Sequence, residues 1–167
     1  ASVILPVGYK LDGLNDSKKL TPKKRDQLFD IIMKDAIQVE YEVISVEDVD
    51  RLNPLESSRL AMTKSVMRMK NVDYVLTDCM DLNVNLPVLS LIKGDAKSAS
   101  IAAASIIAKV TRDRIMAELD SIYPMYEFKK HKGYPTKKHI ELLNKYGIID
   151  GYRLTYGPVK ELTNKNH

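Results

Sequence analysis

Two aspartates, Asp78 and Asp95, combine a residue type and a position that could support metal chemistry. Each comes after a short apolar run, Val72–Thr77 and Val88–Ile92 respectively, that is typical of a buried strand. In open α/β sheets the carboxyl ends of strands line the binding crevice, so both acids are expected at one edge. Carboxylate oxygens suit Mg²⁺, which takes few of them and keeps several waters. An aspartate after a strand is also a common turn or helix cap, so the pair alone leaves both interpretations open.

The segment Lys93–Arg114 must position Asp95, because it is a turn followed by a long helix. Gly94 permits a sharp bend directly before the acid. Ser98 or Ser100 can cap the helix by accepting from its free N–H groups. The following side chains are small or aliphatic as far as Val110, which predicts a buried helix that fixes the acid in space.

Periodicity and capping residues predict the other elements. They are a strand at Ala1–Leu5, a helix at Pro22–Ala36 capped by Thr21, a strand at Val39–Ser45, a short helix opened by the capping box Ser45-x-x-Asp48, a helix at Leu55–Lys70, and a last helix between Thr136 and Gly147. We expect Ala1–Leu5 to pair with Val39–Ser45, and the polar tail from Glu161 to fray.

Composition sets limits on the class of protein. The 167 residues fit one domain, and 44% hydrophobic with 29% charged residues is ordinary for a soluble protein. A net charge of +4 is compatible with a polyanionic partner but does not demand one. A single cysteine, Cys79, excludes an internal disulfide and fits a reducing compartment, and no apolar run is long enough to span a membrane. These features predict a cytoplasmic protein.

Tyrosines and lysines alternate between Tyr123 and Lys138, which makes this stretch the best candidate for a nucleic-acid surface. Lysines neutralise phosphates, and aromatic rings pack on sugars or bases. A solvated basic turn with core tyrosines explains the pattern equally well. The histidines show no metal-ligand spacing, and we expect His139 on the surface of the last helix.

Along its whole length the sequence resembles bacterial type 2 ribonuclease H (ribonuclease HII). The resemblance rests on KGDAKSASIAAASIIAKVTRD from Lys93, GLNDSKKL from Gly13, VLTD from Val75, YPMYEF from Tyr123, KGYPTKKH from Lys132 and R-x-T-Y-x-P-V from Arg153. It implies a ribonuclease H-like α/β fold: a mixed sheet flanked by helices, in a single domain over residues 1–167. A small helical C-terminal part is expected at about residues 120–160.

The resemblance also implies an endonuclease that hydrolyses the RNA strand of RNA–DNA hybrids and nicks duplex DNA at embedded ribonucleotides. Asp78 and Asp95 match its catalytic metal ligands for two Mg²⁺ or Mn²⁺ ions. Ser17, Lys18 and Ser100 match substrate-binding positions. Tyr134 matches the tyrosine that packs against the sugar at an RNA–DNA junction. The alternative is a nucleic-acid-binding protein without catalysis, and in either case a monomer is expected.

The sequence departs from the family pattern at three places. Pro135 stands where glycine is common, and Tyr152 stands where many relatives have histidine. The family's first strand, a central one with an Asp-Glu pair and a Gly-Arg-Gly turn, has no counterpart here. Only two of four metal carboxylates are therefore present, and we expect the 167-residue chain by itself to have little activity, or to be part of a longer protein.

Overall fold

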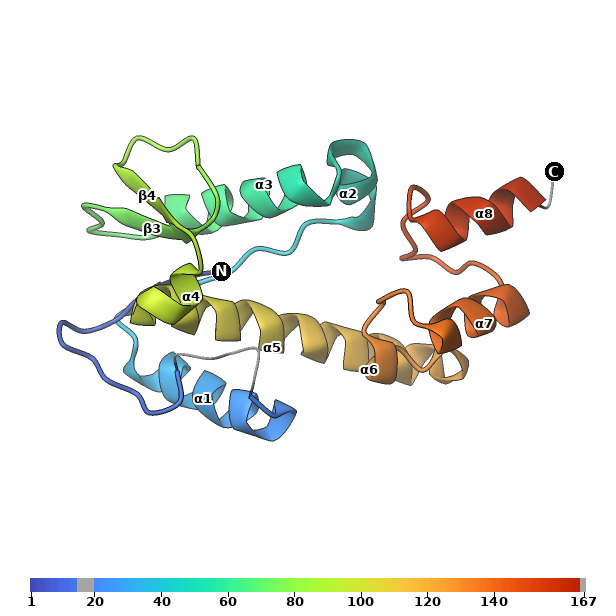
Figure 1. The fold of residues 1–167 in the computed structure, drawn as a ribbon, viewed down its shortest axis with the longest axis horizontal. Helices are drawn as coiled ribbons and strands as arrows, with labels where there is room; N and C mark the ends of the chain where they lie inside the picture. The colour runs from blue at the N-terminus through green and yellow to red at the C-terminus, as the bar shows by residue number, and fades with distance from the viewer. Residues whose placement is uncertain (15–19, 166–167) are drawn as a thin grey trace. The chain divides into compact units, whose positions relative to one another are not determined.

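The structure is a computed structural model that describes residues 1–14 and 20–165 of the chain (Figure 1). The chain divides into two compact units. Unit 1 comprises Ala1–Ile44 and Leu55–Val110, and unit 2 comprises Ser45–Pro54 and Thr111–His167. No helix in the described part of the chain is long and apolar enough to cross a membrane. The assignment of residues 1–167 to one domain stays a prediction.

Unit 1 contains four short strands and the helices that cover them. Its elements are β1 (Ser2–Ile4), α1 (Pro22–Asp35), β2 (Gln38–Glu40), α3 (Pro54–Met67), β3 (Val75–Asp78), β4 (Val88–Leu91), α4 (Gly94–Lys97) and the first half of α5 (Ala99–Ile122). Helix α1 begins as predicted, because Pro22 takes its first position and the Thr21 hydroxyl accepts from the backbone N–H of Lys24.

The strands form one antiparallel and one parallel pair. β1 pairs with β2 antiparallel, with Val3 opposite Val39, and β3 pairs with β4 parallel, with Asp78 opposite Leu91. The α/β class and the pairing of the first strand with the segment after α1 are thus confirmed. The second strand ends at Glu40 rather than Ser45, because Glu40 lies opposite Ser2, where its antiparallel partner β1 begins.

Helix α5 packs against α1 through one face and forms the core of unit 1 (Figure 1). Ala102 and Ala103 are fully buried, so the backbones of the two helices can approach closely. Leu28 and Ile32 of α1 fill the space beside them, together with Ile106 of α5. The predicted cap is Ser98, whose hydroxyl accepts from the N–H of Ile101 at 3.4 Å.

Unit 2 is helical in its described part. It contains α2 (Val46–Leu52), the second half of α5, a 3-10 turn at Pro124–Tyr126, α6 (Phe128–His131), α7 (Lys137–Tyr146) and α8 (Gly157–Lys165). Thr136 caps α7 and Gly147 ends it, as predicted. Helix α8 continues to Lys165, so the tail from Glu161 is helical as far as that residue rather than frayed, and residues 166 and 167 lie outside the described part.

The burial pattern of α5 generates a stability prediction. Ile106→Ala removes a side chain with no exposed surface and should lower the free energy of unfolding by about 2–5 kcal/mol. Ile122→Ala is the matched control on the same helix, because Ile122 is 67% exposed and should change stability by less than about 1 kcal/mol. Urea denaturation of both variants decides, and equal losses would contradict the described core.

Candidate active site

A hydrogen bond from the backbone of Gly94 joins the turn that carries Asp95 to the side chain of Asp78. The N–H of Gly94 donates to Oδ1 of Asp78 at 2.8 Å, so the turn that carries Asp95 lies against the end of β3. Both carboxylates are half-buried. Within the described residues no group of three or more histidine, cysteine or acidic side chains is arranged to hold a metal. The arrangement therefore offers two hard oxygen donors at one strand edge.

Gly94 makes this approach possible, because a side chain at its position would have no room. A Cβ built there would lie 2.7 Å from Cδ1 of Ile101 and 3.2 Å from the carbonyl oxygen of Thr77. Lys93, directly before Gly94, and Cys79, directly after Asp78, adopt left-handed backbone conformations with φ of 54° and 53°. Such conformations are costly for residues with a Cβ and concentrate at functional sites.

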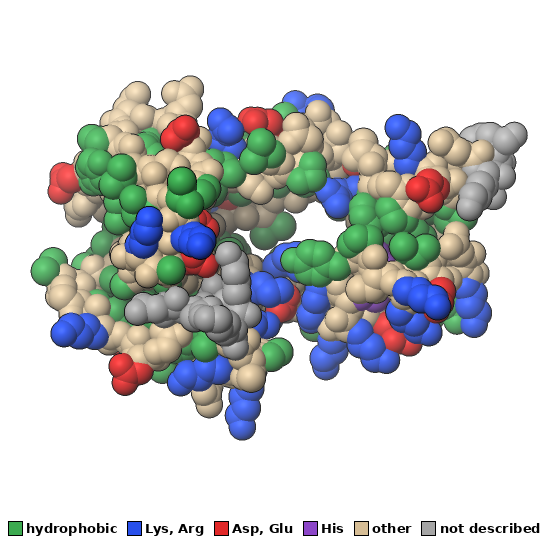
Figure 2. All heavy atoms as spheres, viewed as in Figure 1, with side chains coloured by type: hydrophobic (Ala, Val, Ile, Leu, Met, Phe, Trp, Pro, Cys, Tyr) green, Lys and Arg blue, Asp and Glu red, His purple; other side chains and the backbone are tan. Residues whose placement is uncertain are grey.

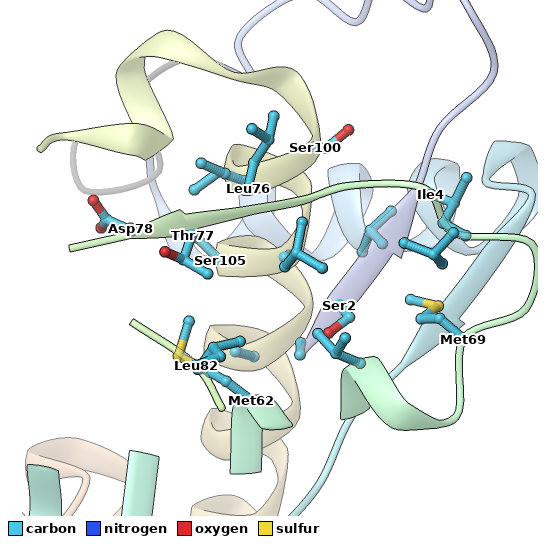
Figure 3. A pocket seen from close by; sticks show the side chains of 18 of the residues that line it. Ser2, Ile4, Met62, Met69, Leu76, Thr77, Asp78, Leu82, Ser100 and Ser105 are labelled. Atoms are coloured by element: carbon cyan, nitrogen blue, oxygen red, sulfur yellow. The ribbon is translucent and has the colours of Figure 1, made fainter. Parts of the chain in front are cut away.

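Ser100 lies near Asp78 in unit 1. It occupies the first turn of α5 and, with Asp78, lines a cavity of about 370 Å³ (Figure 3). The structure thus brings Asp78, Asp95 and Ser100 into one unit. Ser17 and Lys18 lie outside the described residues.

Tyr134 belongs to unit 2 and presents an exposed aromatic ring. The ring is 56% exposed, and the guanidinium carbon of Arg112 lies 4.7 Å from its centroid. Arg112 also donates to the carbonyl oxygen of Lys132 at the start of the same turn. With one face covered by a cation, the ring keeps its other face for a ligand.

The predicted tyrosine and lysine cluster separates into a core and a surface. Tyr126 and Phe128 are buried and stack with ring centroids 5.4 Å apart. The exposed members are Tyr134 and the lysines Lys129, Lys130, Lys137 and Lys138. Figure 2 shows Lys and Arg side chains gathered over α6 and α7. The core aromatic residues of the second interpretation are therefore present, and the nucleic-acid surface stays a prediction.

His139 is buried, which corrects its expected place on the helix surface. Its side chain is 2% exposed and stacks on the ring of His131 with centroids 4.0 Å apart. Nδ1 of His139 lies 2.9 Å from the carbonyl oxygen of Tyr134 and therefore carries the proton. Nε2 then accepts from the hydroxyl of Tyr152 at 2.8 Å. Burial lowers the pKa of His139 and raises the pKa of Tyr152.

His131 supports the same turn from its other side. Its Nε2 lies 2.7 Å from the carbonyl oxygen of Tyr126, and its Nδ1 accepts from the N–H of Gly133 at 3.1 Å. The two neutral imidazoles thus hold the backbone on both sides of Lys132–Tyr134. Because each ring nitrogen already has a partner, this pair is a positioning device for the turn rather than a metal site.

The supporting roles of two residues in unit 2, Asp50 and Arg112, were not predicted from the sequence. Asp50 accepts from the backbone N–H groups of Leu154 and Thr155 at 2.6 and 3.0 Å, and these bonds hold the R-x-T-Y segment. Arg112 supports Tyr134. No pattern in the neighbouring sequence indicates either role, because each residue contacts a partner that is distant in the sequence. Asp50 and Thr155, for example, are 105 positions apart.

Comparisons with known proteins relate the whole chain to one family and one fold. The sequence profile of the family described as Ribonuclease HII matches residues 9–156. A Ribonuclease HII of Listeria innocua is 48% identical over 96% of this chain, and one of Bacillus cytotoxicus is 44% identical over 97%. The chain spans 62% and 63% of these two relatives. A crystal structure of ribonuclease H2 from Pyrococcus horikoshii superposes with a TM-score of 0.74 and 27% identity, over 92% of this chain and 81% of that one.

The close contact at Gly94 is testable by adding one methyl group. Gly94→Ala should destabilise the chain by about 1–3 kcal/mol, because Ile101 or the β3 backbone must move. Gly157→Ala is the matched control, since no atom lies within 4 Å of a Cβ at that position. Chemical denaturation measures both free energies of unfolding. A Gly94→Ala variant as stable as the Gly157→Ala variant would contradict the tight packing of this turn.

The buried neutral His139 predicts an acid-sensitive fold. Its pKa is lowered by burial in the folded state, so the unfolded chain binds more protons in this range. The stability that it contributes is complete above about pH 6.5 and is lost as the pH falls toward the folded pKa. His139→Gln, which keeps a donor for the Tyr134 carbonyl, should flatten the decrease between about pH 7 and 5. Denaturant unfolding across this range measures it, and an unchanged slope would assign the acid sensitivity to another group.

Proposed function

Because this chain belongs to the ribonuclease HII family, we propose that it hydrolyses the RNA strand of RNA–DNA hybrids and nicks duplex DNA at embedded ribonucleotides. The observation that supports the proposal most directly is the hydrogen bond from the Gly94 N–H to Asp78, because Asp95 is the residue next to Gly94. The chain spans less than two thirds of the two relatives named above, so the activity of the whole protein is a proposal for this chain.

Asp78 and Asp95 fit a site for Mg²⁺ or Mn²⁺. Mg²⁺ is commonly held by one or two carboxylates, with waters and substrate phosphates completing its six ligands. A pair of such ions supplies an activated water and stabilises the leaving oxygen of a phosphodiester. The Gly94 N–H binds Oδ1 of Asp78 and restrains this carboxylate, and Oδ2 would then be available to hold an ion.

Unit 2 supplies the surface proposed for the duplex. Its exposed lysines on α6 and α7 neutralise phosphates, which gives affinity without sequence preference. Tyr134 packs its open face on a sugar, and recognition of the 2′-OH separates RNA from DNA at that position. Arg112 and the two histidines keep the ring in place.

A non-catalytic binding protein is the second candidate. It is favoured by the acid count, because the described residues offer only a pair of carboxylates rather than a larger ligand group. A duplex with one embedded ribonucleotide, incubated with and without Mg²⁺, distinguishes the two. We expect slow cutting that needs the metal and spares an all-DNA duplex. Binding without any cutting would favour the second candidate, and equal cutting of all-DNA duplex would refute the specificity.

The metal assignment is testable apart from activity. Asp78→Asn removes one negative charge and should weaken Mn²⁺ binding to this chain at least about tenfold, while affinity for the duplex survives. Cleavage should fall close to background. Asp81→Asn is the matched control, because Asp81 is an exposed aspartate of the loop after β3. Calorimetry measures the affinity of each variant for Mn²⁺. An unchanged Mn²⁺ affinity in Asp78→Asn would mean that this residue is not a metal ligand.

Tyr134→Ala should reduce affinity for a junction-containing duplex by about tenfold, which corresponds to the loss of one stacked ring. Tyr134→Phe keeps the ring and should bind like the original chain. Fluorescence anisotropy with the junction duplex and with all-DNA duplex measures the effect. If alanine weakens both duplexes equally, Tyr134 contributes to general binding and not to the junction.

A further inference from the structure

The hydrogen bonds of His131 fix which of its ring nitrogens carries the proton. Nε2 lies 2.7 Å from the carbonyl oxygen of Tyr126, which can only accept, so Nε2 is the protonated nitrogen. Nδ1 accepts from the backbone N–H of Gly133 at 3.1 Å. A second proton could bind only at Nδ1, where it would point at the Gly133 N–H. The charged form of His131 is therefore incompatible with the bond that holds Gly133.

The backbone directly before Tyr134 can move once this bond is lost. Lys132 and Gly133 both have left-handed conformations, with φ of 53° and 77°. Glycine populates positive and negative φ about equally, so Gly133 can rotate at little cost. Lys132 has a Cβ and is held in an unfavourable conformation, which relaxes if the turn is released.

The stacked pair of histidines has room for one positive charge. The rings of His131 and His139 are 6% and 2% exposed, and their centroids lie 4.0 Å apart. Two charges at this distance, with little water between them, would repel each other strongly. Burial, and to a smaller extent the neighbouring His131, lowers the pKa of His139. We therefore expect the single proton on His131.

Charged groups around the pair are compatible with a proton on His131. The carboxylate of Glu127, directly before α6, lies 2.7 Å from the ammonium of Lys130. Its pKa is lowered chiefly by the hydrogen bond from Lys130 and in small part by His131, so it is ionised and favours a charge on that ring. The other charged groups that face these helices are Lys138 of α7 and, on α5, Arg112 and Asp120. Carboxylates, lysines and arginines ordinarily keep their charge between about pH 5 and 7.

The segment before α8 faces His139 with two phenols. The rings of Tyr152 and Tyr156 lie 5.7 and 6.1 Å from the ring of His139, and Arg153 lies over Tyr156. Burial raises the pKa of both phenols and of Tyr126, so all three stay neutral. Asp50 is bonded to the same segment, and the buried residue of α8, Val159, carries no charge. Among these groups the two imidazoles are those whose charge can change near neutral pH.

We propose that the stacked pair is a pH-dependent switch for the Tyr134 turn, in which uptake of one proton by His131 breaks its bond to Gly133 and releases the turn. Loss of the proton restores the bond, so the change is reversible between about pH 7 and 5. Its consequence for the substrate rests on the proposed function. A released Tyr134 no longer presents its ring to a sugar, so affinity for a junction duplex should fall about tenfold on acidification.

The switch is tested first on the free chain, without nucleic acid. NMR of the ¹⁵N-labelled chain follows the ring nitrogens and the Gly133 amide from about pH 7.5 to 5. At the higher pH the rings should be opposite tautomers, with the proton on Nε2 of His131 and on Nδ1 of His139. The Gly133 amide should then shift with the same midpoint as His131, and its hydrogen-exchange protection factor should fall at least about tenfold. The amide of Leu143, in the buried part of α7, should keep its protection.

A variant separates the charge from the hydrogen bond. The side-chain oxygen of His131→Asn can accept from the Gly133 N–H and takes up no proton in this range. The Gly133 amide and the affinity for the junction duplex should therefore become insensitive to pH. His139→Asn is the matched control, because it keeps a donor for the Tyr134 carbonyl and should leave the titration of Gly133 in place. Circular dichroism checks that both variants fold, and the measurement on the original chain needs neither.

Three results decide between the alternatives. A Gly133 amide that does not respond while His131 gains a proton, or a His131 that stays neutral to pH 5, would overturn the switch. Equal loss of protection at Leu143 would overturn it as well, because unit 2 would then be unfolding as a whole. If the turn opens and affinity for the junction duplex, measured by fluorescence anisotropy, does not change, the switch stands and the role proposed for Tyr134 is wrong.

Discussion

The hydrogen bond between the Gly94 N–H and the Asp78 carboxylate is the contact on which the candidate active site depends. It joins the end of β3 to the first turn of α4 across 16 positions of sequence, and Asp95 is the next residue of that turn. Its geometry requires a residue without a side chain, because Ile101 and the backbone of Thr77 leave no space for a Cβ. Helix α5 follows this turn and packs against α1 in the core of unit 1. The position of the turn therefore depends on the packing of the core.

Local chemistry made much of this fold predictable. Thr21, Ser45 and Thr136 all cap the helices that their sequence contexts indicate, since capping depends on residues three positions away. The apolar runs before Asp78 and Lys93 are strands. The second strand was predicted too long, because Tyr41 and Val43 keep the alternating pattern but lie past Glu40, which is already opposite the first residue of β1, Ser2.

Long-range contacts explain what the sequence could not predict. Asp50 holds Thr155 from 105 positions away, and the stacking of His131 on His139 needs two short helices to meet. The residue type alone did not indicate that these two histidines are buried, because histidine is intermediate in its preference for the interior. The two acids were found from strand ends alone, whereas the support of Tyr134 by Arg112 required the folded chain.

The chain of partners from Tyr134 through His139 to Tyr152 has a consequence for how this sequence can drift. Each link has a fixed polarity, because the Tyr134 carbonyl can only accept and the neutral ring of His139 must then accept from Tyr152. Loss of the Tyr152 hydroxyl alone leaves a buried acceptor unsatisfied, which costs about 1–3 kcal/mol. Neutral evolution here must therefore proceed by coupled replacements, and positions 139 and 152 should change together among descendants of this gene.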